Sequence, residues 1–239
     1  MAVINRKTRR PLRLCVSASS ASFAVASEPM PENLAQKLAD GLAALHLDIP
    51  PDVQAALLDY VALLAKWNRA YNLTAVRQPA QMVVRHLLDS LAVRPYLVGE
   101  RLLDVGSGAG LPGIPLALAE PGRHFTLLDS NGKKVRFLTQ AVAELRLENV
   151  DVVQCRVADF RPEEPFDCIV SRAFSGMAEL IGQAAHLLAP DGCFLFMKGV
   201  YPQAEVAVLP AGWTIEAVHR LEIPGLDAER HLLVVRAAS

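Results

Sequence analysis

The sequence predicts an α/β fold with a mostly parallel sheet, an antiparallel C-terminal hairpin on that sheet and a helical N-terminal extension. Between residues 101 and 198, short apolar runs alternate with segments of helical periodicity, which is typical of parallel strands joined by right-handed crossovers. The first apolar run ends in Asp104 and a glycine-rich loop, and the second ends in Asp129. This arrangement indicates a nucleotide-type site at the carboxyl edge of the sheet.

Residues 1–27 differ in composition from the rest of the chain, with five basic residues, no acidic residue and a Ser/Ala tract. We expect a disordered tail or a misassigned start codon, although a secretory signal or an organelle transit peptide is also compatible with this composition. The full chain has a net charge of −1, so without these five charges residues 28–239 carry −6. An acidic body is poorly suited to bind naked nucleic acid through bulk electrostatics.

We expect residues 28–97 to form a helical cap. A first helix follows Pro50-Pro51, because apolar residues recur at three- and four-residue spacing: Val53, Leu57, Tyr60, Leu64 and Trp67. After a loop over 68–78, a second helix is expected over 79–96, with a buried stripe of Val84, Leu87, Leu88 and Leu91. The face opposite this stripe carries Arg85, His86, Asp89 and Ser90.

Residues 98–239 are expected to form the sheet domain. The predicted strands lie near 101–105, 124–128, 150–155, 166–171 and 193–197, and the predicted helices near 112–120, 132–147 and 176–189. Two further extended runs, 213–223 and 231–236, predict the terminal antiparallel hairpin.

The loop after the first strand is compatible with two kinds of cofactor. Gly108, Gly110 and Gly113 match the G-x-G-x-x-G spacing of a NAD or FAD site. A pyrophosphate in such a site needs free backbone N–H groups at the start of the helix. Pro112 and Pro115 each remove one of these donors, which weakens the dinucleotide interpretation.

Asp104 further favours S-adenosylmethionine (SAM), because its negative charge suits a ligand that carries a sulfonium and an ammonium and has no phosphate. For either cofactor we expect Asp129 to accept hydrogen bonds from the ribose hydroxyls. Side chains in the loop would hold the ligand off the backbone, which explains the glycines at Gly106, Gly108 and Gly110.

Two cations also lie at adjacent strand ends, Arg172 after the fourth strand and Lys198 after the fifth. Adjacent cations are costly to bury without an anionic partner. We expect that partner to be a phosphate or a base carbonyl of a ligand, or a nearby acid such as Glu179.

Composition narrows the class of protein. No apolar run reaches the length of a membrane span before a charge or a proline interrupts it. The four cysteines, Cys15, Cys155, Cys168 and Cys193, show no metal-like spacing, so we expect no metal site. Three of them fall in predicted strands, where buried, reduced thiols and a cytoplasmic location are expected.

Several segments together resemble the RsmG family, also called GidB: KWNRAYNLTAV (66–76), VRHLLDSL (84–91), LLDVGSGAGLPGIPLAL (102–118), TLLDSNGKKVRFL (126–138), SRAF (171–174) and MKG (197–199). The resemblance runs from about residue 34 to 236. It implies a class I SAM-dependent methyltransferase domain over 98–239. It also implies that the enzyme methylates N7 of one guanine in 16S rRNA near the decoding centre, giving 7-methylguanosine.

Matching motif to motif, the resemblance implies SAM contacts at Gly106, Leu111, Val157, Ala158 and Arg172, to which the loop and strand-end arguments add Gly108 and Asp129. Many members of the family have an acidic residue where this chain has Ala158, so a side-chain contact is absent there. Backbone groups of Val157 and Ala158 can still meet the adenine edge, and the neighbouring Asp159 is a candidate replacement.

Guanine N7 has a free lone pair at neutral pH, so we expect positioning rather than a proton-transfer residue to carry catalysis. Arg85, His86 and Lys198 are candidate substrate contacts, although a neutral hydrogen bond between elements is an equal alternative for His86. The expected partner is 16S rRNA within a small ribosomal subunit or its precursor, bound by a monomer without membrane contact. Three rivals stay open: a NAD oxidoreductase, a methyltransferase for a small molecule or protein, and a non-catalytic SAM-binding module.

Overall fold

The computed structural model describes residues 32–172 and 176–238, so the tail expected over 1–27 lies outside the described residues. A seven-stranded sheet has the order β3-β2-β1-β4-β5-β7-β6. The strands are β1 (Arg101–Val105), β2 (His124–Asp129), β3 (Val150–Gln154), β4 (Phe166–Arg172), β5 (Leu188–Lys198), β6 (Trp213–Arg220) and β7 (His231–Ala237). Strands β1 to β5 are parallel, and β7 is antiparallel to both β5 and β6. The predicted mostly parallel sheet with an antiparallel hairpin is confirmed.

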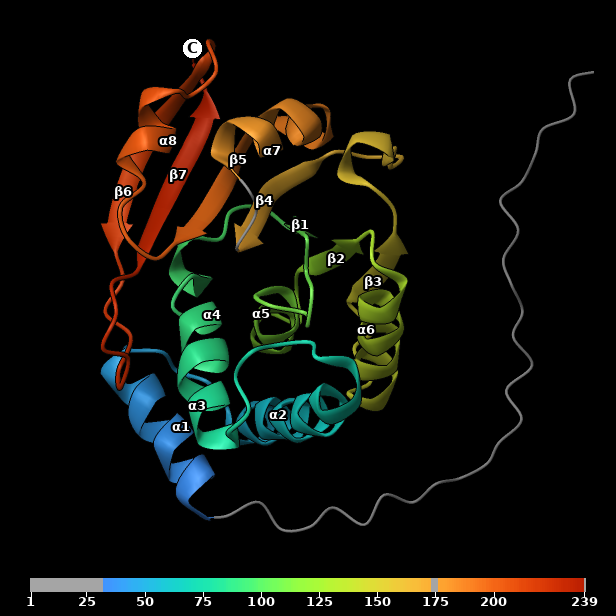
Figure 1. Ribbon diagram of the computed structural model, residues 1–239, viewed down its shortest axis with the longest axis vertical. Coiled ribbons are helices and arrows are strands. Elements are labelled where there is room, and N and C mark those ends of the chain that lie inside the picture. Colours follow the sequence, from blue (N-terminus) through green and yellow to red (C-terminus); the bar gives the residue numbers. More distant parts are fainter. Residues whose placement is uncertain (1–31, 173–175, 239) are drawn as a thin grey trace, which may run out of the picture.

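The helices cover both faces of this sheet (Figure 1). They are α1 (Glu32–Ala44), α2 (Pro51–Tyr71), α3 (Pro79–Met82), α4 (Asp89–Leu91), α5 (Gly113–Ala119), α6 (Gly132–Glu144), α7 (Met177–Ala184) and α8 (Gln203–Ala207). The sequence pattern did not predict α8. It also placed the start of β5 too late, near 193, whereas this strand begins at Leu188.

Both faces of the strands are buried, because successive side chains point to opposite sides of the sheet. Leu102 and Phe125 belong to the core beneath α5, α6 and the N-terminal helices, while Leu103 and Ile169 belong to the core beneath α7. This two-sided burial explains why the strands read as continuous apolar runs rather than as an alternating pattern.

The N-terminal helices support the glycine loop that follows β1. Tyr60, on α2, is fully buried and its hydroxyl donates a 2.6 Å hydrogen bond to the carbonyl of Ala109 in that loop. One further contact joins α2 to α6: the rings of Trp67 and Phe137 meet edge to face at 5.7 Å. The extension therefore packs against both the glycine loop and α6.

The single helix expected over 79–96 is divided. A π-helical turn, Val83–Leu88, separates α3 from α4, and a 3-10 turn follows at Arg94–Tyr96. The expectation of a polar face directed away from the core is wrong for His86, Asp89 and Ser90, which are buried, and holds only for Arg85, which is exposed. That face is covered because it packs against the 72–78 loop and arginines of the sheet domain.

Asp89 is the point where these parts meet. Its side chain is 3% exposed, and its two carboxylate oxygens pair with different arginines. Arg172 Nη1, at the end of β4, lies 3.2 Å from Oδ2, and Arg230 Nε, just before β7, lies 2.7 Å from Oδ1. One carboxylate thus joins the helical extension to two separate segments of the sheet domain.

We expect Asp89→Asn to lower the free energy of unfolding by about 1–3 kcal/mol, because it leaves two arginines facing a neutral amide. The loss should stay below the ~3–5 kcal/mol of a fully buried broken pair, since both arginines can still reach water. Urea denaturation monitored by fluorescence measures it. Asp151→Asn, which removes the exposed pair with His124, is the matched control and should cost less than about 0.5 kcal/mol. Equal effects of the two substitutions would contradict the role given to Asp89.

Candidate active site

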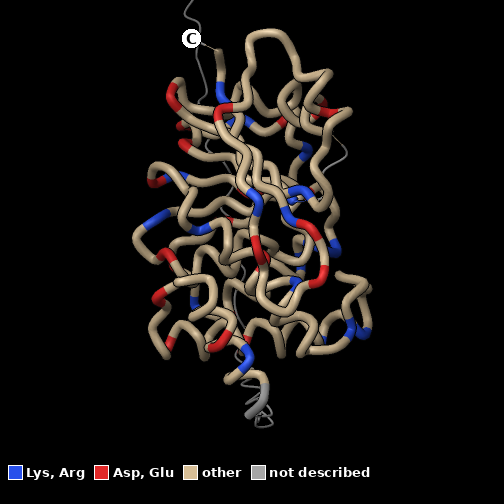
Figure 2. The backbone as a smooth tube through the Cα atoms, turned by 90° about the vertical axis from the view of Figure 1, so that its left-hand side faces the viewer, with Lys and Arg blue, Asp and Glu red and all other residues tan. Residues whose placement is uncertain are grey.

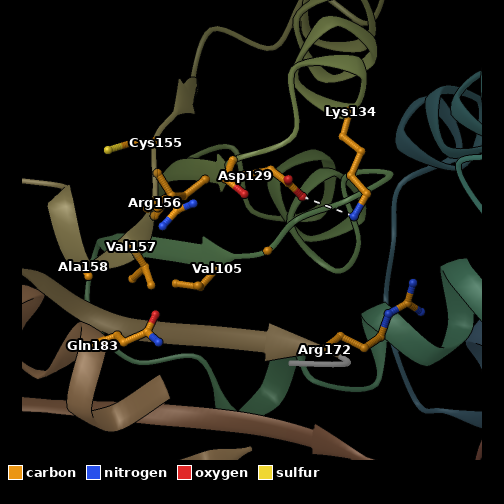
Figure 3. Close-up of a pocket in the computed structure, with 12 residues that line it drawn as sticks. Val105, Asp129, Lys134, Cys155, Arg156, Val157, Ala158, Arg172 and Gln183 are labelled. Atoms are coloured by element: carbon orange, nitrogen blue, oxygen red, sulfur yellow. Dashed lines mark ion pairs between the residues drawn. The ribbon is translucent and has the colours of Figure 1, made fainter. Parts of the chain in front are cut away.

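A cavity of about 500 Å³ opens at the carboxyl ends of the parallel strands (Figure 3). Its volume lies within the roughly 300–1,000 Å³ of typical cofactor sites. The lining residues come from β1, β2, β4, α6, α7 and the segment after β3: Val105, Gly106, Leu128, Asp129, Ser130, Lys134, Cys155, Arg156, Val157, Ala158, Arg172 and Gln183. This is the edge of the sheet at which the sequence predicts a ligand.

The structure brings together most of the residues predicted to bind the cofactor. Those that line the cavity are Gly106, Asp129, Val157, Ala158 and Arg172. Gly108 and Leu111 do not line it. Leu111 is buried in the core at 3% exposure, and the N–H of Gly108 donates to the Asp129 carboxylate.

Asp129 ends β2 and is held by the loops on either side of it. Its Oδ2 accepts a hydrogen bond from the N–H of Gly108 at 2.9 Å, and its Oδ1 accepts one from the N–H of Asn131 at 2.8 Å. Lys134 Nζ lies 3.6 Å from Oδ2, the contact dashed in Figure 3. Each carboxylate oxygen has a second lone pair, so Asp129 can still accept hydrogen bonds from ligand hydroxyls.

Asp104 lies beneath the loop rather than beside the cavity, which corrects the expectation of direct charge contact with the ligand. Its side chain is 1% exposed and its Oδ2 accepts a 3.0 Å hydrogen bond from the N–H of Gly113, at the start of α5. Its Oδ1 has no partner among the described residues. Burial raises the pKa of this carboxyl to about 7.

The loop glycines serve two different purposes. Gly108 (φ +60°) is open on its side-chain side, where a Cβ would meet nothing closer than the carbonyl of Gly106 at 3.7 Å. Gly110 (φ +84°) is buried, and a Cβ there would collide with the side chain of Ile114. The prediction that Gly110 makes room for the ligand is therefore wrong, because core packing is what requires glycine at this position.

Protein carboxylates pair with both cations predicted at the strand ends. Arg172 pairs with Asp89, and Lys198 Nζ lies 2.8 Å from each carboxylate oxygen of Glu205, on α8. The sequence suggested Glu179 as an example of such an acid, whereas the observed partners are Asp89 and Glu205. Arg172 is the only one of the two cations that lines the cavity.

His86 and Arg85 have different surroundings although they are adjacent. The His86 side chain is buried, with Nε2 2.9 Å from Thr74 Oγ1 and Nδ1 2.9 Å from the carbonyl of Arg85. Burial, and then the positive charge of Arg172, lower the pKa of His86 to about 4, so the ring is neutral at pH 7. This placement favours the hydrogen bond between elements over an RNA contact. Arg85 is exposed, and its carbonyl accepts a hydrogen bond from Arg172.

The sequence analysis did not predict some of the residues that line the cavity. Gln183 lies within α7, where no motif marks it, whereas Lys134 could have been found as a residue in the first turn of the helix after Asp129. Cys155 lies just beyond β3 and is half-buried in the cavity wall, not enclosed in a strand as expected. Asp159 is exposed and does not line the cavity, so it does not replace the acid missing at Ala158.

Within residues 32–172 and 176–238, no group of three or more His, Cys, Asp or Glu side chains is placed to hold a metal ion. The helices of this part of the chain are each too short or too polar to cross a membrane.

Comparison with solved structures shows a familiar fold. A SAM-dependent methyltransferase from Aquifex aeolicus superposes with a TM-score of 0.54 at 16% identity, over 72% of this chain and 97% of that one. The mitomycin 7-O-methyltransferase MmcR gives a TM-score of 0.55 at 15% identity, over 67% of this chain and 56% of that one. At these identities the likeness concerns the fold alone, and it confirms the class I methyltransferase architecture.

Comparison of the sequence with known proteins identifies the family. The family described as rRNA small subunit methyltransferase G (GidB) matches residues 53–233. The protein of that name from Marinobacter nauticus is 56% identical over 202 residues, which cover 84% of this chain and 94% of the relative. The one from Yersinia enterocolitica is 51% identical over 203 residues, covering 84% and 98%. The chain therefore belongs to the rRNA small subunit methyltransferase G family.

Proposed function

We propose that this protein transfers the methyl group of SAM to N7 of a specific guanine in 16S rRNA, giving 7-methylguanosine. One observation carries the proposal. In a chain of the rRNA small subunit methyltransferase G family, the cavity at the strand ends is lined by most of the residues that motif matching assigns to SAM.

The residues around the cavity suit this cofactor. Asp129 can accept hydrogen bonds from the ribose hydroxyls, and backbone groups of Val157 and Ala158 can meet the adenine edge. The open space over Gly108 lets a ligand approach the backbone. When bound, SAM supplies an electrophilic methyl group on a sulfonium. Asp104 contributes its negative charge from beneath the loop.

The chain's own task is alignment. With SAM bound, guanine N7 would form a bond to the methyl carbon while the bond from that carbon to the sulfonium sulfur breaks, and the electron pair would stay on a neutral thioether. No proton is lost, so the chain need only align the three atoms, and such positioning is worth roughly 7–11 kcal/mol. The product base carries a positive charge, which a free cation at N7 would oppose. Lys198 and Glu205 form a one-to-one pair, whereas Asp89 is shared by Arg172 and Arg230, so that cluster keeps one net positive charge. Arg172 and Lys198 can contact the guanine carbonyl or a flanking phosphate, while Arg85 offers a further cation at the surface.

We further propose that a monomer acts in the cytoplasm on a small ribosomal subunit or its precursor. The net charge of −6 on residues 28–239 supports a structured particle, because the body as a whole repels naked RNA.

The purified protein should transfer a labelled methyl group from SAM to small subunits or 16S rRNA that lack this mark. Nuclease digestion and chromatography should then show 7-methylguanosine as the labelled nucleoside. No such product from folded, SAM-binding protein would contradict the proposal. Methyl transfer to a small molecule or protein in the absence of RNA would support the alternative methyltransferase class instead.

Asp129→Asn should weaken SAM binding by about 10- to 100-fold, because an amide replaces one charged acceptor and turns an N–H toward a backbone N–H. Calorimetric titration with SAM measures this. The matched control is Asp151→Asn on β3, which removes the exposed carboxylate that pairs with His124. This variant should bind SAM like the wild type. Unchanged affinity in Asp129→Asn would remove this carboxylate from the proposed site.

Asp104 predicts a pH dependence of SAM binding. Its pKa of about 7 lies above the unfolded value of about 3.9, so this carboxyl destabilises the cofactor-free protein progressively from pH 4 to pH 7. A cationic ligand favours the ionised form, so binding should release a proton. SAM affinity should therefore rise between about pH 6 and pH 7.5 in the wild type.

Asp104→Asn should flatten this profile, measured by calorimetry in buffers of different ionisation enthalpy. In the absence of SAM, the same substitution should remove the fall in unfolding free energy between pH 4 and pH 7. A wild-type-like pH profile of binding in the variant would exclude Asp104 as its source.

A further inference from the structure

Basic residues are segregated in two segments of the chain. Residues 60–88 contain four Lys or Arg and no Asp or Glu, and residues 130–143 contain three and none. We call the exposed members of this set the basic rim: Lys66, Arg69, Arg77, Arg85, Lys133 and Arg136. By contrast, Figure 2 shows acidic and basic residues interspersed on the side of the molecule that carries β6, β7 and α1.

The rim gathers several cations that have no acidic partner. Among the described residues, no carboxylate forms an ion pair with any member of the basic rim. Elsewhere on the protein, Arg94, Arg123 and Arg236 pair with glutamates, and the cations without an ion pair, such as Lys37 and Arg146, lie outside these two segments. The positive charge of the rim is therefore available to an external anion.

The 72–78 loop places part of this charge beside the cavity. The Asn68 side chain, buried at 2% exposure, accepts a hydrogen bond from the N–H of Thr74 and donates one to the carbonyl of Val76. Thr74 is in turn bonded to His86, on the turn whose Arg85 carbonyl meets Arg172 in the cavity wall. In Figure 1 this loop arches between α4 and α6, in front of α5.

An aromatic pair continues the surface on the other side of the loop. Tyr71, the last residue of α2, is 39% exposed, and its ring stacks on Trp67 at 5.1 Å. Trp67 contacts Phe137, which lies one turn along α6 from the cavity residue Lys134. No described residue hydrogen-bonds the Tyr71 hydroxyl. Because Trp67 supports the ring and the side chain is partly exposed, the ring can stack with a ligand.

We propose that the basic rim and the Trp67–Tyr71 pair form the docking surface for single-stranded RNA that flanks the target guanine, with one flanking base stacked on Tyr71. The inference rests on the proposed rRNA methylation. Unpaired cations interleaved with an exposed, supported aromatic ring are what a nucleic acid strand requires, whereas a neutral protein partner would leave the cations unmatched. The acidic remainder of the body repels phosphates and so orients the strand toward this rim.

The first test is the salt dependence of binding to unmethylated small subunits and to in vitro transcribed, unmethylated 16S rRNA. Arg69→Gln/Arg77→Gln should weaken binding at physiological salt by on the order of 10-fold. It should also reduce the slope of log K against log[salt] by about 1.4, if each arginine meets one phosphate. The matched control, Lys37→Gln/Arg146→Gln, removes the same charge from residues without ion pairs that do not line the cavity, and should keep the wild-type slope.

The second test addresses stacking. Tyr71→Ala should raise the KM for RNA by about 10- to 100-fold, while Tyr71→Phe should keep the wild-type value because the ring remains. Neither should change kcat or the KM for SAM, since Tyr71 does not line the cavity. Calorimetric SAM binding shows that each variant is folded.

The outcomes separate this inference from the proposed function. If the wild type makes no 7-methylguanosine in rRNA, the proposed function fails. If the wild type is active but Arg69→Gln/Arg77→Gln and Tyr71→Ala bind RNA with wild-type affinity and salt slope, the docking surface is wrong. If these variants lost affinity for assembled subunits but bound protein-free rRNA normally, the surface would contact a ribosomal protein. That result would also overturn the inference.

Discussion

The carboxylate of Asp89 is the interaction on which the arrangement of this protein depends. It is buried, and it pairs with one arginine at the end of β4 and with another just before β7. A buried charge is tolerated only when it is paired, so moving either arginine would leave the carboxylate partly uncompensated. Because Arg172 also lines the cavity, the helical extension helps to fix the geometry of the cavity wall. The extension thus positions a residue of the cavity wall, although every lining residue belongs to the sheet domain.

Charge is arranged differently at the reacting centre and around it. Near the cavity, Arg172 and Lys198 each have a carboxylate partner, although Arg172 shares Asp89 with Arg230, and these partners reduce the repulsion of a product that gains a positive charge. On the rim the cations have no acidic partners, which suits attraction of phosphates. Because the unpaired cations lie on the rim, they can attract the phosphates of the RNA while staying away from the guanine ring. The neutral, buried His86 fits this division, since a second charge beside Arg172 would disturb it.

The sequence predicted the parts of the site that follow from strand ends. Asp129 was found because parallel strands end at one edge, so residues after different strands converge there. Gly106 and the Val157–Ala158 pair were assigned by the family resemblance, and they line the cavity at the same edge. Helical periodicity could not reveal that His86 and Asp89 are buried. The partners of Asp89 lie 83 and 141 residues away, and periodicity within one helix carries no information about them.

The predictions for Asp104 and Gly110 were wrong for a similar reason. Asp104 lies in β1 just before the loop that motif reasoning associates with the ligand, and Gly110 lies within that loop, yet both are buried and contact α5. A motif identifies the loop but not which of its residues face inward. Gln183 was missed for the opposite reason, because it reaches the cavity from the middle of a helix with no distinctive pattern.

The position of β7 determines when the sheet can be completed during synthesis of the protein. This strand lies between β5 and β6, although the ribosome makes it after both. Until it emerges, β5 is an open edge and β6 has no neighbour in the sheet, and Arg230 has not yet reached Asp89. We expect the nascent chain to lack a finished cavity wall during almost the whole of its synthesis. An enzyme that modifies ribosomal RNA thus becomes competent only as it leaves a ribosome.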